Sequence, residues 1–209
     1  MKVSASFLSS DDVCSTLKKL NVTDVDYIHV DIMDGKFVSN KTMPFSEMKH
    51  IADYTSKRLD VHLMVDNPSK YIPLYAELNA EYITFHVEVS EDIEKCLNMI
   101  KDYSIKCGLA IKPDTKVSKL IPYLPLLDMI LVMSVEPGRG GQEFIEGSDD
   151  KIFEIRELIN SYNLNNIVIN VDGGINDKTC IKCRDADMVV AGSYIVKSDN
   201  YQEKITSLR

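Results

Sequence analysis

The stretch Asp26-Tyr27-Ile28-His29-Val30-Asp31 is a short, apolar run of the kind that favours a β-strand. A run of this length suits a buried strand and is too short for a helix. Seven further runs of the same kind occur along the chain, at Lys2–Phe7, Leu59–Met64, Tyr82–His86, Lys106–Ile111, Met129–Met133, Ile167–Val171 and Asp187–Ala191. The sequence therefore predicts eight buried strands.

The segments between these runs have helical spacing. Apolar residues recur every three or four positions, as at Ile152, Ile155 and Ile159. Strands that alternate with helices predict parallel strands joined by right-handed crossovers. Eight such units favour an α/β fold, a closed (β/α)8 TIM barrel, over an open doubly wound sheet, because no GxGxxG motif follows the first run. We expect one catalytic barrel domain over residues 1–209.

The composition excludes several classes of protein. With 24 basic and 32 acidic residues the formal net charge is −8, which argues against a nucleic-acid-binding or anionic-membrane-binding surface. No stretch is apolar enough to span a bilayer, and residues 1–8 lack the core of a signal peptide. The five cysteines are scattered, and the C-x-x-C at Cys180 and Cys183 has no second pair to complete a zinc site. We therefore expect a cytoplasmic protein.

Polar side chains gather at the predicted strand ends, where the working residues of such barrels lie. His29 and Asp31 alternate on one strand and so share a face. His62, His86 and Asp172 lie at the ends of three other strands. A single histidine there is more often an ordinary hydrogen-bonded residue. The imidazoles of His29 and His62 with the two carboxylates, however, form a ligand set suited to Zn²⁺, Fe²⁺, Mn²⁺ or Co²⁺.

Glycines form a second pattern. Three consecutive strands are followed by glycine-containing loops, at residues 136–142, 172–174 and 191–193. Glycine lets the backbone approach an oxyanion closely, and barrels often hold a phosphate with the loops after the last two strands. One such loop alone would be an ordinary turn. Three at the same end of a barrel predict a phosphate site.

Five segments, taken in order, resemble the ribulose-phosphate 3-epimerase family. They read HVDIMDG at 29–35, DVHLMV at 60–65, VMSVEPG at 132–138, GGQ at 140–142 and VDGGI at 171–175. The likeness extends from Ser6 to Ser193. It implies a (β/α)8 barrel of the pentose phosphate pathway that interconverts ribulose 5-phosphate and xylulose 5-phosphate. It also implies a homo-oligomer and a sugar phosphate as the partner.

The resemblance assigns roles to individual residues. Asp31 and Asp172 would be the acid–base pair, moving a proton at C3 on opposite faces of the sugar, and one divalent ion would be held by these two aspartates with His29 and His62. Substrate contacts would come from Ser6, His62, Gly138, Arg139, Gly140, Gly141, Asp172, Gly173, Gly174, Gly192 and Ser193. The pocket would be walled by Met33, Met64 and Met133.

The sequence departs from the family pattern at four positions. Arg139 stands where phenylalanine is usual between the loop glycines, and Lys36 stands where histidine is commoner. Ala5 and Ser39 replace prolines. None of the four is a ligand or an acid–base residue. Arg139 leaves substrate preference open, but not the reaction type.

Three alternatives remain at this stage. A hexulose-phosphate 3-epimerase, acting on allulose 6-phosphate, would use the same chemistry in a longer pocket. A Schiff-base aldolase would need a desolvated lysine, for which Lys112 is the candidate. A phosphate-binding barrel without catalysis would not need the histidine and aspartate set.

Overall fold

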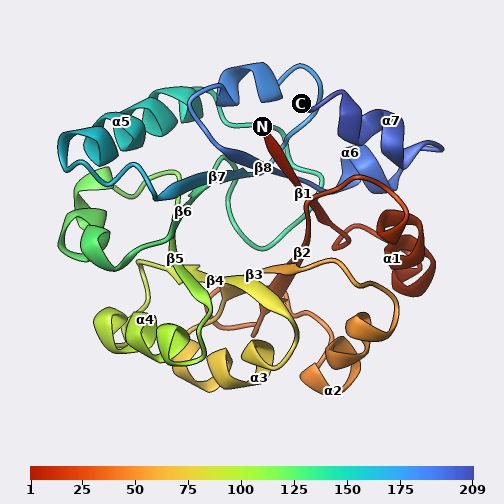
Figure 1. The fold of residues 1–209 in the computed structure, drawn as a ribbon, viewed down its shortest axis with the longest axis horizontal. Helices are drawn as coiled ribbons and strands as arrows, with labels where there is room; N and C mark the ends of the chain where they lie inside the picture. The colour runs from red at the N-terminus through yellow and green to blue at the C-terminus, as the bar shows by residue number, and fades with distance from the viewer.

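The computed structural model describes residues 1–209 and shows a closed barrel of eight parallel strands in chain order (Figure 1). Strand β1 pairs with both β2 and β8, which closes the sheet. This confirms the (β/α)8 barrel. The strands are β1 (Lys2–Ser6), β2 (Tyr27–Met33), β3 (Leu59–Met64), β4 (Ala80–His86), β5 (Lys106–Ile111), β6 (Met129–Met133), β7 (Val168–Asp172) and β8 (Met188–Ala191).

Helices surround the barrel as an outer layer (Figure 1). The α-helices are α1 (Val13–Asn21), α2 (Phe45–Met48), α3 (Ile72–Ala76), α4 (Ile93–Asp102), α5 (Ser148–Ser161), α6 (Ser193–Val196) and α7 (Tyr201–Thr206). The 3₁₀ segments are η1 (Lys49–Asp53), η2 (Pro68–Lys70), η3 (Val117–Leu126) and η4 (Cys180–Cys183).

The expectation of an α-helix in every crossover needs correction, because two crossovers contain only 3₁₀ turns. Segment η3 joins β5 to β6, and η4 joins β7 to β8. Pro122 and Pro125 lie inside η3. Proline has no backbone N–H and its ring clashes with the carbonyl four residues earlier, so these two residues oppose a regular α-helix.

The main hydrophobic core lies between the barrel and the helices. It is a cluster of 50 buried residues, and it includes outward-facing strand residues such as Ile28, Val30 and Val61. Burying one face of each helix against the sheet is what stabilises a layered α/β domain. The outward strand faces are therefore committed to packing, and chemistry is left to the inward faces.

The inward faces are stacked in layers, each contributed by alternate strands, as is usual in such barrels. The strand register gives these layers from bottom to top. They are Tyr27, Tyr82, Met129 and Met188; then Ser4, Asp60, Gly108 and Asn170; then His29, Thr84, Leu131 and Val190; then Ser6, His62, Ala110 and Asp172; and finally Asp31, His86 and Met133. The three buried histidines, with Asp31 and Asp172, thus lie in the upper three layers, toward the C-terminal ends of the strands.

Gly108 is the one residue of the second layer without a side chain, and its size is required by its neighbours. A Cβ added there would lie 2.6 Å from Thr84 Oγ1 and 3.1 Å from the Met129 carbonyl oxygen. We expect Gly108→Ala to destabilise the protein by about 1–3 kcal/mol, the usual cost of overpacking a core. Thermal unfolding would measure this, with Ser90→Ala on an exposed turn as the control. An unchanged melting temperature for Gly108→Ala would contradict the layer assignment.

None of the helices has the length and apolarity that crossing a membrane would require.

Candidate active site

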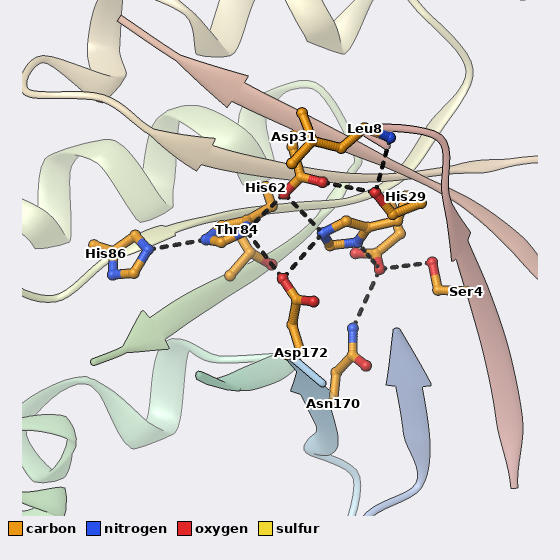
Figure 2. Close-up of polar contacts among 12 residues, drawn as sticks. Ser4, Leu8, His29, Asp31, His62, Thr84, His86, Asn170 and Asp172 are labelled. Atoms are coloured by element: carbon orange, nitrogen blue, oxygen red, sulfur yellow. Dashed lines mark hydrogen bonds and ion pairs between the residues drawn. The ribbon is translucent and has the colours of Figure 1, made fainter. Parts of the chain in front are cut away.

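Four side chains converge inside the upper barrel: His29 and Asp31 from β2, His62 from β3 and Asp172 from β7 (Figure 2). One potential ligand atom from each lies within 4.8 Å of all the others. His29 Nε2 is 3.4 Å from Asp31 Oδ1 and 3.7 Å from Asp172 Oδ2. His62 Nδ1 is 3.4 Å and 3.8 Å from the same two oxygens. The structure therefore brings together the four residues that the sequence pointed to.

The donor set fits a divalent transition metal. Metal–ligand bonds of about 2.1 Å in a tetrahedral site separate neighbouring ligand atoms by roughly 3.4 Å, close to the spacings found here. In addition, His29 Nε2 and His62 Nδ1 are buried and have no hydrogen-bond partner. Buried polar atoms without partners are costly, so two of them aimed at one point indicate a bound group.

The ring of His29 is oriented from below by a buried carboxylate. His29 Nδ1 lies 2.8 Å from Asp60 Oδ2. The same oxygen accepts hydrogen bonds from Ser4 Oγ at 2.9 Å and from Asn170 Nδ2 at 3.2 Å. When the ring is neutral, with its one proton on Nδ1 and donated to Asp60, the lone pair of His29 Nε2 faces the cluster. Such carboxylate–histidine pairs commonly orient metal ligands.

The acid–base properties of the two aspartates differ. Burial alone would raise the pKa of Asp31, but the charge of the nearby His29, together with His62, holds that pKa well below its usual range. Burial raises the pKa of Asp172 to about 6, and the neighbouring charge of Asp31 acts in the same direction. Burial lowers the pKa of His29, but Asp31 and Asp60 outweigh it and hold that pKa well above its usual value. The pair therefore contains one firmly ionised carboxylate and one that can hold a proton.

In metal-free protein, Asp172→Asn is expected to raise stability at pH 8 and to change it little at pH 5. The folded-state pKa of Asp172, about 6, is above its ordinary 3.8, so its contribution to stability is fully present below pH 4 and is lost as pH rises through 6. Asparagine stays neutral throughout. The side chain is 19% exposed, so we expect a gain of about 1–2 kcal/mol rather than the full value of the shift. Thermal unfolding with excess chelator would test this, and an equal effect at both pH values would contradict it.

A cavity of about 650 Å³ opens above the four-residue cluster. Asp31 and Asp172 line it, whereas the fully buried His29 and His62 do not. The contact of His62 with substrate thus stays a prediction. The other residues expected at substrate or in the pocket wall all line the cavity: Ser6, Met33, Met64, Met133, Gly138, Arg139, Gly140, Gly141, Gly173, Gly174, Gly192 and Ser193. Lys112, considered for a Schiff base, is not among its lining residues and has its ammonium over the Phe37 ring.

Gly173 and Gly174 bring the loop after β7 against that after β6. Both have positive φ, and a Cβ at Gly173 would lie 2.9 Å from Val135 N, while one at Gly174 would overlap the backbone of Phe144. Ser134 fixes the same turn, because its Oγ donates to the carbonyl oxygens of Asp172 and Gly173 at 3.0 Å and 2.7 Å. Only glycine permits this approach, which leaves the backbone accessible at this end of the cavity.

The cavity carries cationic side chains that sequence reasoning missed. Lys178 and Lys197 line it together with the predicted Arg139. Arg139 is exposed, and its carbonyl oxygen accepts a hydrogen bond from Gln142 Nε2. The lining also contains the acidic Asp31, Glu136, Glu143 and Asp172, so these three cations can pair with one anionic group of a ligand rather than make the whole cavity positive.

Comparison with known proteins identifies the family. The family model described as "Ribulose-phosphate 3 epimerase family" matches residues 2–196. The chain belongs to this family. It is 36% identical over 211 residues to the ribulose-phosphate 3-epimerase of Helicobacter pylori (strain J99), covering 100% of this chain and 97% of that protein. It is 32% identical over 213 residues to the Bacillus subtilis (strain 168) enzyme of the same name, covering 100% and 98%. The protein is thus an epimerase of a family that acts on sugar phosphates.

Solved structures of other proteins share the fold of this epimerase. The crystal structure of KGPDC from Streptococcus mutans superposes with a TM-score of 0.72 at 12% identity, covering 99% of this chain and 94% of that one. A 3-hexulose-6-phosphate synthase from Salmonella typhimurium gives 0.65 at 17% identity, covering 100% and 96%. At such low identities the likeness shows the barrel alone.

Two further parts of the epimerase site escaped the sequence analysis. Asp60 and Asn170 orient His29, and each lies two residues before a predicted ligand on the same strand. Residues two apart on a strand point to the same face, so this spacing could have placed Asp60 and Asn170 inside the barrel with the ligands. His86 was noted only as a strand end; its Nε2 lies 2.9 Å from His62 Nε2.

Proposed function

We propose that this epimerase inverts C3 of D-ribulose 5-phosphate to give D-xylulose 5-phosphate, in the pentose phosphate pathway. The observation that carries the proposal is the pair of carboxylates that line one cavity from β2 and β7, Asp31 and Asp172. Inversion beside a carbonyl needs a proton carrier on each face of the sugar. Two carboxylates from separate strands that face one cavity meet that requirement.

Side chains of the protein transfer the protons, orient the acid–base groups and exclude water. The Asp31 carboxylate accepts the C3 proton from one face, and the protonated Asp172 donates a proton to the other face; in the reverse direction they exchange roles. Ser6 Oγ donates to Asp31 Oδ2 at 2.9 Å and thereby fixes the orientation of this carboxylate. The methionines Met33, Met64 and Met133 exclude water from the reacting atoms.

The cluster would hold one divalent ion, Zn²⁺, Fe²⁺, Mn²⁺ or Co²⁺, through His29, Asp31, His62 and Asp172. When bound, it acts as a Lewis acid that stabilises the negative charge of the enediolate. The phosphate of the sugar would lie against the backbone of Gly138–Gly141, Gly173, Gly174, Gly192 and Ser193, with Arg139 alongside.

We further propose that residues 1–209 act as one catalytic domain in a cytoplasmic homo-oligomer without nucleic-acid or membrane partners. The five unpaired cysteines support a reducing compartment. The oligomer rests on the resemblance to the family, and a molar mass measured in solution would test it.

The direct test is incubation with ribulose 5-phosphate in D₂O, followed at C3 with and without chelator. We expect solvent deuterium at C3 in both epimers, and loss of both exchange and inversion after chelation. Allulose 6-phosphate serves as the parallel substrate, and faster turnover of that hexulose would reassign the specificity. No deuterium incorporation from either sugar would refute epimerisation by proton transfer and leave a binding protein.

A further inference from the structure

On the side of His62 opposite the four-residue cluster lies a second histidine, His86, that the proposed mechanism does not use (Figure 2). His62 Nε2 and His86 Nε2 are 2.9 Å apart, and their ring centroids are separated by 5.0 Å (Figure 2). Both side chains are fully buried. His86 Nδ1 in turn lies 3.1 Å from Glu88 Oε2, and Glu88 Oε1 accepts a hydrogen bond from the Lys112 backbone N–H at 2.9 Å.

This chain of contacts admits only one arrangement of protons when both imidazoles are neutral. An ionised carboxylate only accepts hydrogen bonds, so the Glu88 contact requires the His86 proton on Nδ1. His86 Nε2 is then an acceptor. The proton between the two rings must therefore be on His62 Nε2, which leaves the lone pair of His62 on Nδ1. That Nδ1 is the buried atom without a partner that faces Asp31 and Asp172.

We propose that His86 and Glu88 are positioning residues that hold His62 in the tautomer with its Nδ1 lone pair directed into the metal cluster. Asp60 plays the corresponding part for His29 but selects the other tautomer, in which Nδ1 is the donor and Nε2 faces the cluster. The two imidazoles thus offer different nitrogens, and each is set by its own partner behind the ring. The inference rests on the proposed metal site.

The contacts from Glu88 through His86 to His62, here called the relay, are shielded from water by neighbouring side chains. The Phe37 ring packs on His86 with centroids 4.7 Å apart. The Lys112 ammonium lies over the Phe37 ring, 4.2 Å from its centroid. Because His86 is fully buried, no solvent molecule replaces Glu88 as its acceptor. His86 is also outside the four-residue cluster, so its effect on a metal must pass through His62.

Three variants separate this role from simple packing. His86→Phe keeps an aromatic ring but removes the acceptor, so the His62 Nε2–H loses its partner. His86→Gln places an amide oxygen near the position of Nε2 and restores an acceptor. His50→Phe changes an exposed histidine whose ring pairs with Asp53 on the surface and serves as the matched control. Circular dichroism and melting temperature establish that each variant is folded.

The first measurement is the affinity for Zn²⁺ alone, by competition with a chelator. We expect His86→Phe to bind Zn²⁺ about 10–100-fold more weakly than the parent, as is typical when a partner behind a ligand is removed. His86→Gln should recover most of that loss, and His50→Phe should match the parent. Equal Zn²⁺ affinity in His86→Phe and the parent, or no recovery in a folded His86→Gln, would overturn the relay.

The second measurement uses the metal-free parent protein and needs no variant. Two-dimensional ¹⁵N–¹H correlation spectra of the histidine rings should show His86 neutral with its proton on Nδ1, and His62 protonated on Nε2. A His86 proton on Nε2 would overturn the proposal. If the parent binds no Zn²⁺ at all, the metal part of the proposed function fails, and the tautomers still decide the relay.

Discussion

Asp172→Asn should lower the rate of epimerisation by about 10²–10⁴-fold, the contribution of a positioned general acid–base group. Asparagine is close to aspartate in shape but cannot carry a proton between the sugar and solvent. Steady-state kinetics on ribulose 5-phosphate would measure the loss. The Michaelis constant should change much less, because the glycine-containing loops and the cationic side chains proposed to bind the phosphate are untouched.

Hydrogen exchange makes this prediction sharper. Asp172→Asn retains Asp31, so it should still exchange the C3 hydrogen of one epimer with D₂O while failing to invert it. Asp31→Asn should show the reciprocal pattern with the other epimer. Asp177→Asn, an exposed change five residues after Asp172 in the loop that follows β7, is the matched control and should behave as the parent. Metal content must be equal in all variants. Exchange of both epimers by Asp172→Asn would contradict the assignment of one carboxylate to each face.

The barrel could be predicted because its signals are local. Each strand carries its own apolar run, and alternation places His29 and Asp31 on one face of β2 wherever that strand lies in the sheet. The C-terminal ends of parallel strands meet at one rim, so His62 and Asp172 were expected nearby. The structure brings all four side chains within reach of one ion.

The contacts that could not be predicted depend on the register between neighbouring strands and on the path of the loops. The register pairs His29 with Asp60 and Asp31 with His62, and nothing in the sequence states which residues of neighbouring strands are opposite each other. The same limitation applies to His86, whose contact with His62 follows from the offset of β4 against β3. Lys178 and Lys197 lie on loops whose path is set by tertiary packing, so they carried no signal that they would line the cavity.

Removal of the divalent ion should reduce turnover by at least about 10³-fold, because Lewis-acid stabilisation of the developing charge supplies several kcal/mol. The protein would be dialysed against a strong chelator, with metal content checked by elemental analysis, and then assayed before and after addition of Zn²⁺, Fe²⁺, Mn²⁺ or Co²⁺. Recovery with one or more of these ions is expected. Full activity in verified metal-free protein would contradict the proposed role of the cluster.

Stability offers an independent check on the same ion, since a ligand bound only by the folded state raises the melting temperature. Protons compete with a metal for carboxylate and imidazole ligands, and the Asp172 carboxyl, with its pKa of about 6, holds a proton at pH 5 in the metal-free protein. The difference in melting temperature between metal-loaded and metal-free protein should therefore widen between pH 5 and pH 8. His29→Gln removes one ligand and should shrink that difference at pH 8, whereas His50→Gln on the surface should not. A difference independent of pH, or unaffected by His29→Gln, would place the ion elsewhere.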